Sequence, residues 1–115
     1  MKDVSLDAIE LIRRSTTEKE FQQSIINVAH LLGWKVYHTW SSIRSVAGFP
    51  DLVLVRRDRL IFAEVKTENG KVTKAQQEWL DNLQHVAEVY VFRPRDWTNV
   101  VDILGKKNSP SGNNR

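Results

Sequence analysis

The sequence predicts an α/β protein in which helices cover both faces of a mixed β-sheet. Amphipathic segments with helical spacing alternate with short apolar runs of β composition. The runs at 51–55 and 60–66 are apolar on both faces, which a sheet tolerates only when both faces are covered. With 115 residues and 41% hydrophobic residues, the chain is sized for one core. We expect a single domain over residues 1–105, followed by a disordered polar tail at 106–115.

Two helices are expected before the first strand. Residues 4–14 carry apolar positions among charges, which favours a short amphipathic helix. From Thr17, the segment TEKEFQQSIINVAHLLGW places its apolar residues at helical spacing, and Gly33 is expected to end this helix. Thr17 and Glu20 together match a capping box.

A β-hairpin is the central prediction. Residues 35–40 have strand composition, and a loop closed by Gly48 and Pro50 follows. The runs 51–55 and 60–66 are then separated by the charged segment RRDR. A turn centred between residues 57 and 58 pairs residue 55 with 60, 53 with 62, and Asp51 with Glu64. Lys66 falls on the same face as Glu64 because side chains alternate along a strand.

The second half of the chain predicts helix, strand and helix. After the polar loop TENGKV, Thr73 is expected to cap a helix over residues 74–83. Residues 89–92 supply another strand, and Asp96 is placed to start a last helix over 97–104, which Gly105 ends. The order of core elements is therefore α-β-β-β-α-β-α. Three tryptophans are expected in the core: Trp34, Trp79 and Trp97.

The composition of the chain excludes several kinds of metal site. The chain has no cysteine, which excludes disulfides and thiolate metal sites, and its three histidines lack any paired spacing. Oxygen ligands are the remaining choice for a metal ion. The net charge of +3 and the pI near 9.4 suit a polyanionic partner. No signal peptide or membrane-spanning run is recognisable, so we expect a soluble cytoplasmic protein that binds no membrane.

The predicted register sets two carboxylates side by side. Asp51 and Glu64 would have Cβ atoms roughly 5 Å apart, and two like charges at that distance are costly unless a cation joins them. Mg²⁺ or Mn²⁺ prefers such oxygen ligands. The Lys66 ammonium would lie on the same face, where it could orient water or stabilise charge at phosphorus. The alternative is a solvated strand end on which Glu64 pairs with Lys66, but the Gly-Phe-Pro-Asp turn and the apolar hairpin favour the metal site.

These motifs resemble a known nuclease family. GFPDLVLV followed by FAEVKTENGKVTKAQQEWL is similar to the VRR-NUC family of the PD-(D/E)XK superfamily, with the similarity running from Thr17 to about residue 97. The chain has the size of stand-alone phage and prophage members, which resemble Holliday-junction resolvases. The resemblance implies a restriction-endonuclease-like core in which Asp51, Glu64 and the backbone carbonyl of Val65 bind Mg²⁺, with Mn²⁺ as a substitute. It also implies that Lys66 is catalytic.

The resemblance further implies a glutamate in the first core helix and a glutamine after the Glu-x-Lys strand. Glu18 heads the inward stripe of the helix, whereas Glu20 lies on a polar face and has a sufficient role as the capping-box acid, so we assign Glu18 to the site. Gln76 matches the glutamine. It also stands three residues after Thr73, so a catalytic role and a second capping box are equally supported.

Several side chains are candidate DNA contacts. Basic residues in expected loops or at helix starts could contact phosphates, although a solvated surface charge is the favoured interpretation for any one of them. His38 and Trp40 flank the loop that leads to Asp51, and Trp40 could stack on an unpaired base. The basic candidates are Arg44, Arg56, Arg57, Arg59, Lys71 and Lys74.

The leading hypothesis is a metal-dependent DNA endonuclease, selective for branched DNA such as a Holliday junction, in repair, recombination or phage replication. We expect a homodimer, because a chain of this size is too small to embrace a junction alone. One alternative is a restriction-like or nicking nuclease that works with a partner. Another is an inactive DNA-binding module on the same fold, against which the intact Asp51, Glu64 and Lys66 argue.

Overall fold

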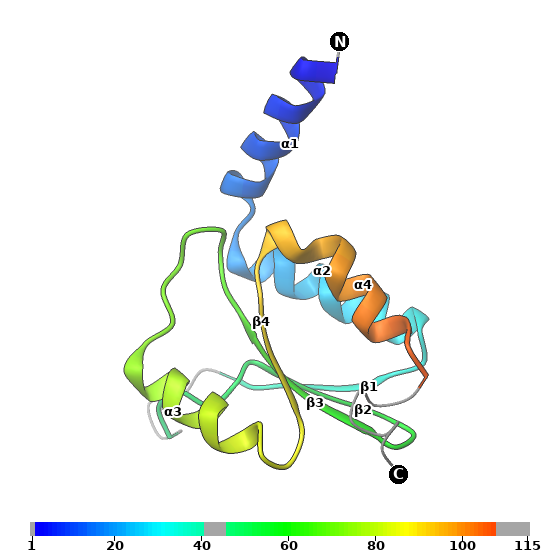
Figure 1. The fold of residues 1–115 in the computed structure, drawn as a ribbon, viewed down its shortest axis with the longest axis vertical. Helices are drawn as coiled ribbons and strands as arrows, with labels where there is room; N and C mark the ends of the chain where they lie inside the picture. The colour runs from blue at the N-terminus through cyan, green and yellow to red at the C-terminus, as the bar shows by residue number, and fades with distance from the viewer. Residues whose placement is uncertain (1, 41–45, 108–115) are drawn as a thin grey trace.

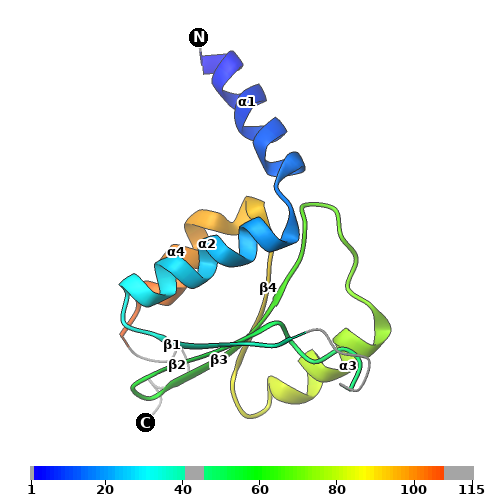
Figure 2. The ribbon, with the colours of Figure 1, turned by 180° about the vertical axis from the view of Figure 1, so that it is seen from behind.

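The computed structural model describes residues 2–40 and 46–107 of the chain, with side chains from Leu6 onward. Figures 1 and 2 show its helices and strands from two opposite sides. The elements are α1 (Lys2–Ser15), α2 (Glu18–Leu31), β1 (Lys35–His38), β2 (Leu52–Arg56), β3 (Arg59–Val65), α3 (Lys74–Leu83), β4 (Glu88–Phe92), the 3-10 turn η1 (Pro94–Asp96) and α4 (Trp97–Gly105).

The four strands form one mixed sheet in the order β1-β2-β3-β4. The strand pairs β1–β2 and β2–β3 are antiparallel, whereas β3–β4 is parallel and is connected through α3. The hairpin has the expected register, with Val53 opposite Phe62 and Val55 opposite Leu60. Its paired ladder ends at Leu52 and Ala63, so the predicted pair Asp51 and Glu64 lies one position beyond the ladder. The predicted α/β class and mixed sheet are therefore confirmed.

Helices cover both faces of this sheet. In both views α2 and α4 lie side by side on one face, and α3 lies on the other (Figures 1 and 2). The core between the sheet and α2/α4 takes one set of alternating residues from each hairpin strand. Its buried members include Phe21, Ile25, Ala29, Leu52, Leu54, Ile61, Ala63, Val65, Val100 and Leu104. On the α3 face, Phe49 packs edge-on against Phe62 and Trp79 at centroid distances of 5.8 and 5.0 Å.

Both core helices that flank the hairpin begin with the expected capping boxes. The Thr17 hydroxyl accepts from Glu20 N at 3.1 Å, and the Glu20 carboxylate accepts from Thr17 N at 2.9 Å. Gly33 ends α2 with φ of +90°, a conformation that glycine adopts without strain. The boundaries of α3 and its cap Thr73 are those predicted. Asp96 precedes α4 as predicted, but its carboxylate bonds Arg93 N in the 3-10 turn instead.

The turn end of the hairpin is held by a buried charge. Arg59 is 1% exposed, donates to both carboxylate oxygens of Glu88 at 2.8 and 2.6 Å, and bonds the carbonyls of Ile103 and Lys106 at the end of α4. These bonds satisfy carbonyls that a helix end leaves unpaired. The expectation that Arg59 contacts phosphate is therefore wrong, because its guanidinium is enclosed in the protein.

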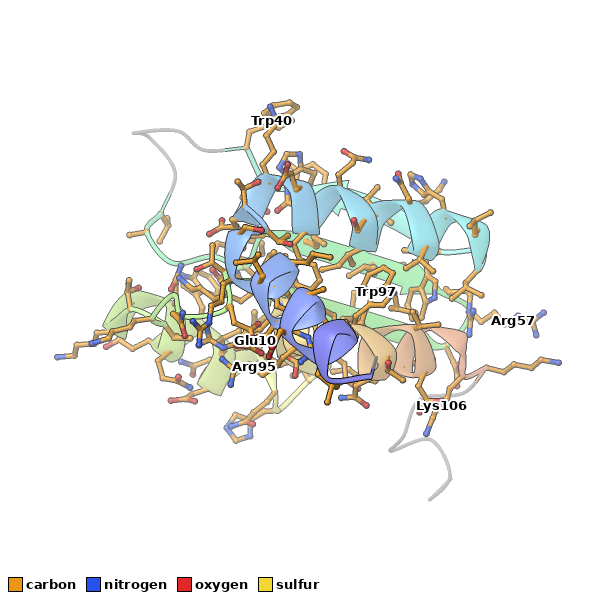
Figure 3. All side chains as sticks on the ribbon, turned by 90° about the horizontal axis from the view of Figure 1, so that it is seen from above. Glu10, Trp40, Arg57, Arg95, Trp97 and Lys106 are labelled. Atoms are coloured by element: carbon orange, nitrogen blue, oxygen red, sulfur yellow. The ribbon has the colours of Figure 1, made fainter. Side chains whose placement is uncertain are left out.

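The other arginines of this hairpin also lie at its turn, far along the strands from Asp51. Arg56 donates to the Leu32 carbonyl at 2.8 Å, whereas Arg57 is exposed at the turn. Figure 3 shows Arg57 at the edge of the molecule opposite α3. Among the tryptophans, Trp34 is buried and Trp79 half-buried, but the prediction for Trp97 is wrong: it is 38% exposed at the start of α4.

The first helix projects from the body of the molecule (Figures 1 and 2). Its exposed apolar side chains are Leu6, Ile9, Leu11 and Ile12. A hollow of about 500 Å³, lined by Ile9 and Ile12 together with Phe21 and Trp97, lies where α1 meets α2 and α4. Within the described parts of the chain, no helix is long and apolar enough to cross a membrane.

We expect Arg59→Ala to destabilise the protein by about 3–5 kcal/mol, because it leaves Glu88 buried without its partner. Urea unfolding followed by circular dichroism measures this. Arg57→Ala, two residues away but exposed, is the matched control and is expected to change stability by less than about 0.5 kcal/mol. Equal losses in the two variants would contradict a specific role for the buried pair.

Candidate active site

Polar side chains from four elements converge at one end of the sheet, where β2 begins and β3 ends. The amino terminus of α2 reaches this end from one face, and that of α3 from the other (Figures 1 and 2). The structure brings together five residues singled out from the sequence: Glu18, Asp51, Glu64, Lys66 and Gln76.

Asp51 connects the two hairpin strands just beyond their paired ladder. Its Oδ2 accepts a hydrogen bond from Val65 N at 2.8 Å. Continuing the register places Pro50 opposite Val65, and proline has no N–H to donate. In a strand, the carbonyl of a residue points to the same side as its N–H, so the Val65 carbonyl is directed toward the Pro50 position, which offers no amide donor. The Pro-Asp dipeptide thus leaves both a carboxylate and a carbonyl at this point.

Glu64 is buried, with 2% of its surface exposed. Its Oε2 accepts from Gln76 Nε2 at 2.8 Å and lies 3.8 Å from Lys66 Nζ. Its Oε1 is buried and has no hydrogen-bond partner. A buried acceptor without a partner costs about 1–3 kcal/mol, so this oxygen marks a place where a ligand would be stabilising.

Gln76 completes a capping box and also contacts Glu64. Its Oε1 accepts from Thr73 N at 2.9 Å, which completes a capping box at the start of α3. Its Nε2 is thereby turned toward Glu64. The amide oxygen thus accepts from the helix cap while the amide nitrogen donates to Glu64. A glutamate has no N–H and would not provide the second bond.

The two glutamates of the EKE segment separate as expected. Glu20 is occupied by the capping box, which lowers its pKa through hydrogen bonds with Thr17. Glu18 faces the site instead: partial burial and the Asp51 charge raise its pKa, while the Lys66 charge lowers it. The structure therefore places Glu18, and not Glu20, beside the carboxylate pair.

The carboxylates repel one another in the absence of a cation. Burial and the adjacent Asp51 carboxylate raise the pKa of Glu64 to about 8, against a smaller opposing effect of Lys66. Lys66 by itself therefore does not neutralise the cluster. Within residues 2–40 and 46–107, no three His, Asp or Glu side chains gather closely enough to form a metal site unaided. Mg²⁺ needs no such cluster, because it usually keeps several waters and binds one or two carboxylates together with substrate phosphates.

Gly48 fits the loop before Asp51 tightly against α3. Its φ is +92°, and a Cβ there would lie 2.5 Å from the Ala75 carbonyl carbon and 2.8 Å from Gln76 N. Only glycine permits so close a backbone approach. The loop that delivers Asp51 and the helix that delivers Gln76 are thus packed directly on each other.

A match to a family model agrees with this geometry. The model of the VRR-NUC domain, a PD-(D/E)XK-type nuclease domain, matches residues 6–95, which is most of the chain. The chain belongs to the VRR-NUC family. Neither the comparison with curated proteins nor that with solved structures found a match. The family makes this a nuclease domain, for which DNA is the implied substrate.

Of the candidate DNA contacts in this VRR-NUC domain, Lys71 and Lys74 are exposed, in the loop before α3 and at its first residue. Arg44 lies outside the described residues. His38 is half-buried, and its Nε2 lies 2.8 Å from the Gln22 side-chain amide. Trp40 is 72% exposed.

Sequence reasoning missed three residues that shape the VRR-NUC site. Gln22 follows Glu18 by four positions, which places it on the same helix face, but its contact with His38 was not predicted. Arg93 donates to the carbonyls of Thr67 and Gly70, and the Arg95 backbone N donates to Glu68, so β4 and η1 hold the loop after Lys66. No spacing in the sequence connects these arginines with that loop.

Gly48→Ala is expected to cost about 1–3 kcal/mol of stability, because the added Cβ meets backbone atoms and the positive φ strains any other residue. Thermal unfolding measures the loss. Gly105→Ala, where the new Cβ meets nothing within 4 Å, is the control and is expected to be near neutral. A Gly48→Ala protein as stable as the wild type would contradict the tight packing of this loop on α3.

The raised pKa of Glu64 predicts how stability depends on pH in EDTA. An acid whose pKa is higher in the folded state than in the unfolded state contributes stability below its unfolded pKa of about 4.5, which is lost as the pH rises through about 8. The Tm in EDTA is therefore expected to fall between pH 5 and pH 8.5. Glu64→Gln should flatten this part of the profile, and an unchanged slope would show that Glu64 is not its source.

Proposed function

We propose that this nuclease is a Mg²⁺-dependent DNA endonuclease that cuts at branched structures. The observation that carries the proposal is the buried Glu64 Oε1, which has no hydrogen-bond partner and lies on a carboxylate whose other oxygen is held by Gln76. The Asp51 carboxylate belongs to the same cluster, and together with the Val65 carbonyl it would complete an all-oxygen set of the kind that Mg²⁺ prefers. Mn²⁺ has the same ligand preference and is expected to substitute.

The site residues have different roles in the proposed reaction. When bound, the ion supplies an activated water and stabilises charge on the attacking and leaving oxygens. Asp51 and Glu64 hold the metal site open on the sheet end. Lys66 brings its ammonium into a largely buried position 3.8 Å from Glu64 Oε2, where it can orient a water and offset charge at the phosphate. Glu18 faces Asp51 and Lys66 and can hold further water at the site.

Gln76 supports the metal ligand without binding the metal. Its hydrogen bond fixes the orientation of Glu64 and leaves Oε1 as the free oxygen. Partners of this kind are worth about 10–100-fold in metal affinity or activity. The structure therefore supports a positioning role for Gln76 in addition to its capping role.

The decisive test is cleavage of labelled four-way junctions, flaps, splayed arms and duplex DNA with Mg²⁺, Mn²⁺ or EDTA. We expect the wild type to cut branched DNA with either ion and not in EDTA. Asp51→Ala or Glu64→Gln should lower the rate by at least about 10²–10³-fold. A wild type that binds these DNAs but never cuts them would identify an inactive DNA-binding module, and cleavage of unbranched duplex alone would favour the restriction-like alternative.

Gln76→Ala is expected to reduce cleavage by about 10–100-fold and to raise the Mg²⁺ concentration needed for half-maximal rate. Gln77→Ala is the matched control, because Gln77 is exposed on the same helix turn and its side-chain amide donates to Asp81 at 2.8 Å, away from Glu64. Since loss of the cap alone would also destabilise α3, both variants are compared at temperatures where circular dichroism shows them fully folded. Equal Mg²⁺ dependence in the two variants would show that Gln76 does not support the metal site.

We also propose that the active form is a homodimer. The small size of the chain supports this, as do the apolar side chains that α1 leaves exposed: Leu6, Leu11 and Ile12. Light scattering after gel filtration is expected to give about twice the 13.3 kDa of one chain. A monomer at the concentrations at which four-way junctions are cut would contradict the dimer.

A further inference from the structure

We propose that Trp40, supported by His38, is a stacking platform for an unpaired base close to the phosphodiester that is cut. The inference rests on the proposed nuclease function and deepens it, because it names the feature of DNA that would be recognised. Trp40 has the highest exposed fraction of the four tryptophans, 72%. Figure 3 shows its ring projecting from the molecule beyond the amino-terminal part of α2.

The ring is held from one side. The His38 and Trp40 rings lie 4.9 Å apart between centroids, tilted by 40°. His38 is fixed in turn, because its Nε2 lies 2.8 Å from Gln22 Nε2 on α2. Two side chains thus support an aromatic ring whose remaining surface faces solvent, so little ordering entropy is lost when a flat ligand stacks on it.

Thr39, the residue before Trp40, is hydrogen-bonded to the backbone at Pro50 and Asp51. Thr39 donates from its N to the Asp51 carbonyl at 2.8 Å and from its hydroxyl to the Pro50 carbonyl at 2.8 Å. With strands about 4.8 Å apart and a rise of about 3.3 Å per residue, continuing the register of β1 and β2 puts the Trp40 backbone roughly 6 Å from that of Asp51. This distance corresponds to about two nucleotides along a strand.

A row of side chains on the α2 side of the sheet also connects the site with Trp40. Glu18 faces Asp51, and Gln22 follows it by one helical turn and contacts His38, which contacts Trp40. Tyr37, the neighbouring exposed aromatic of β1, points to the opposite face because side chains alternate along a strand. Only one of the two aromatics therefore lies on the side that carries Glu18.

An unpaired base fits this surface better than a duplex or an apolar protein partner. In a duplex the face of each base is covered by its neighbours, whereas at a branch or in a single strand that face is free to stack on an aromatic ring. The immediate neighbours of Trp40 on this row are polar: Gln22, His38 and Thr39. A protein interface places its aromatic anchors in well-packed desolvated pockets, which this row does not supply.

The test uses splayed-arm DNA that carries a single 2-aminopurine at successive positions around the branch, with Asp51→Ala protein and Mg²⁺ so that the DNA stays intact. Stacking on tryptophan is expected to quench the fluorescence at one or two positions beside the branch. Adding Trp40→Ala should abolish this quenching and weaken binding by about 5–100-fold, whereas Trp40→Phe should retain part of both. Tyr37→Ala is the matched control and should behave as the Asp51→Ala parent.

The same variants are then compared in the otherwise wild-type enzyme. Trp40→Ala should raise KM for splayed-arm DNA by a similar factor and change KM for fully paired duplex by less than about 2-fold. Equal loss on both DNAs would overturn the inference and identify Trp40 as a duplex contact or an intercalating wedge. Absence of quenching by Trp40-containing protein would overturn it as well.

Failure of this inference is distinguishable from failure of the proposed function. A wild-type enzyme that cuts branched DNA while Trp40→Ala behaves identically defeats the platform and leaves the nuclease assignment intact. A wild type that cuts nothing defeats the proposed activity. The fluorescence measurement, made on uncut DNA, still decides whether an unpaired base stacks on Trp40.

Discussion

The burial of Glu64 beside Asp51 is the constraint on which the rest of the site depends. A carboxylate with 2% exposure next to another acid is unfavourable, and the repulsion appears in the raised pKa of Glu64. The surrounding chain reduces this cost only in part. Gln76 donates to one oxygen and Lys66 lies near the same one, while the other oxygen has no partner. The fold thus holds an acid in a position that a bound cation would stabilise.

The helices on the two faces of the sheet position their site residues by the same local motif. Both α2 and α3 begin at the site with a capping box, and in both the residue three positions after the threonine turns back to the cap. At α2 this leaves Glu18 directed toward the carboxylates; at α3 the returning residue itself, Gln76, bonds Glu64. Helix amino termini carry partial positive charge, so their convergence also favours an anionic phosphate at this end of the sheet.

The features that could be predicted from the sequence are those that depend on a local period or spacing of residues. The position of the turn predicted the register of the hairpin, and with it the proximity of Asp51 and Glu64. Helical spacing separated Glu18 from Glu20. The contacts that escaped prediction join segments far apart in the chain. Arg59 looked like a solvated turn charge because its partner Glu88 comes 29 residues later. The close packing of Gly48 on α3 depends on how the loop crosses the sheet end, which no spacing reveals.

The two ends of the hairpin differ in how well their buried charges are paired. This difference explains how a small chain tolerates the unfavourable burial of Glu64. At the turn, the Arg59 guanidinium has every described partner it needs: two carboxylate oxygens, two helix carbonyls and the face of Trp34 at 5.0 Å. At the other end the charges are only partly matched. Because a domain of this size has a stability of only about 5–15 kcal/mol, an unpaired buried acid is tolerable only where the remaining charges are well paired. The fully bonded arginine and the underbonded glutamate are therefore best understood together, as opposite ends of the same two strands.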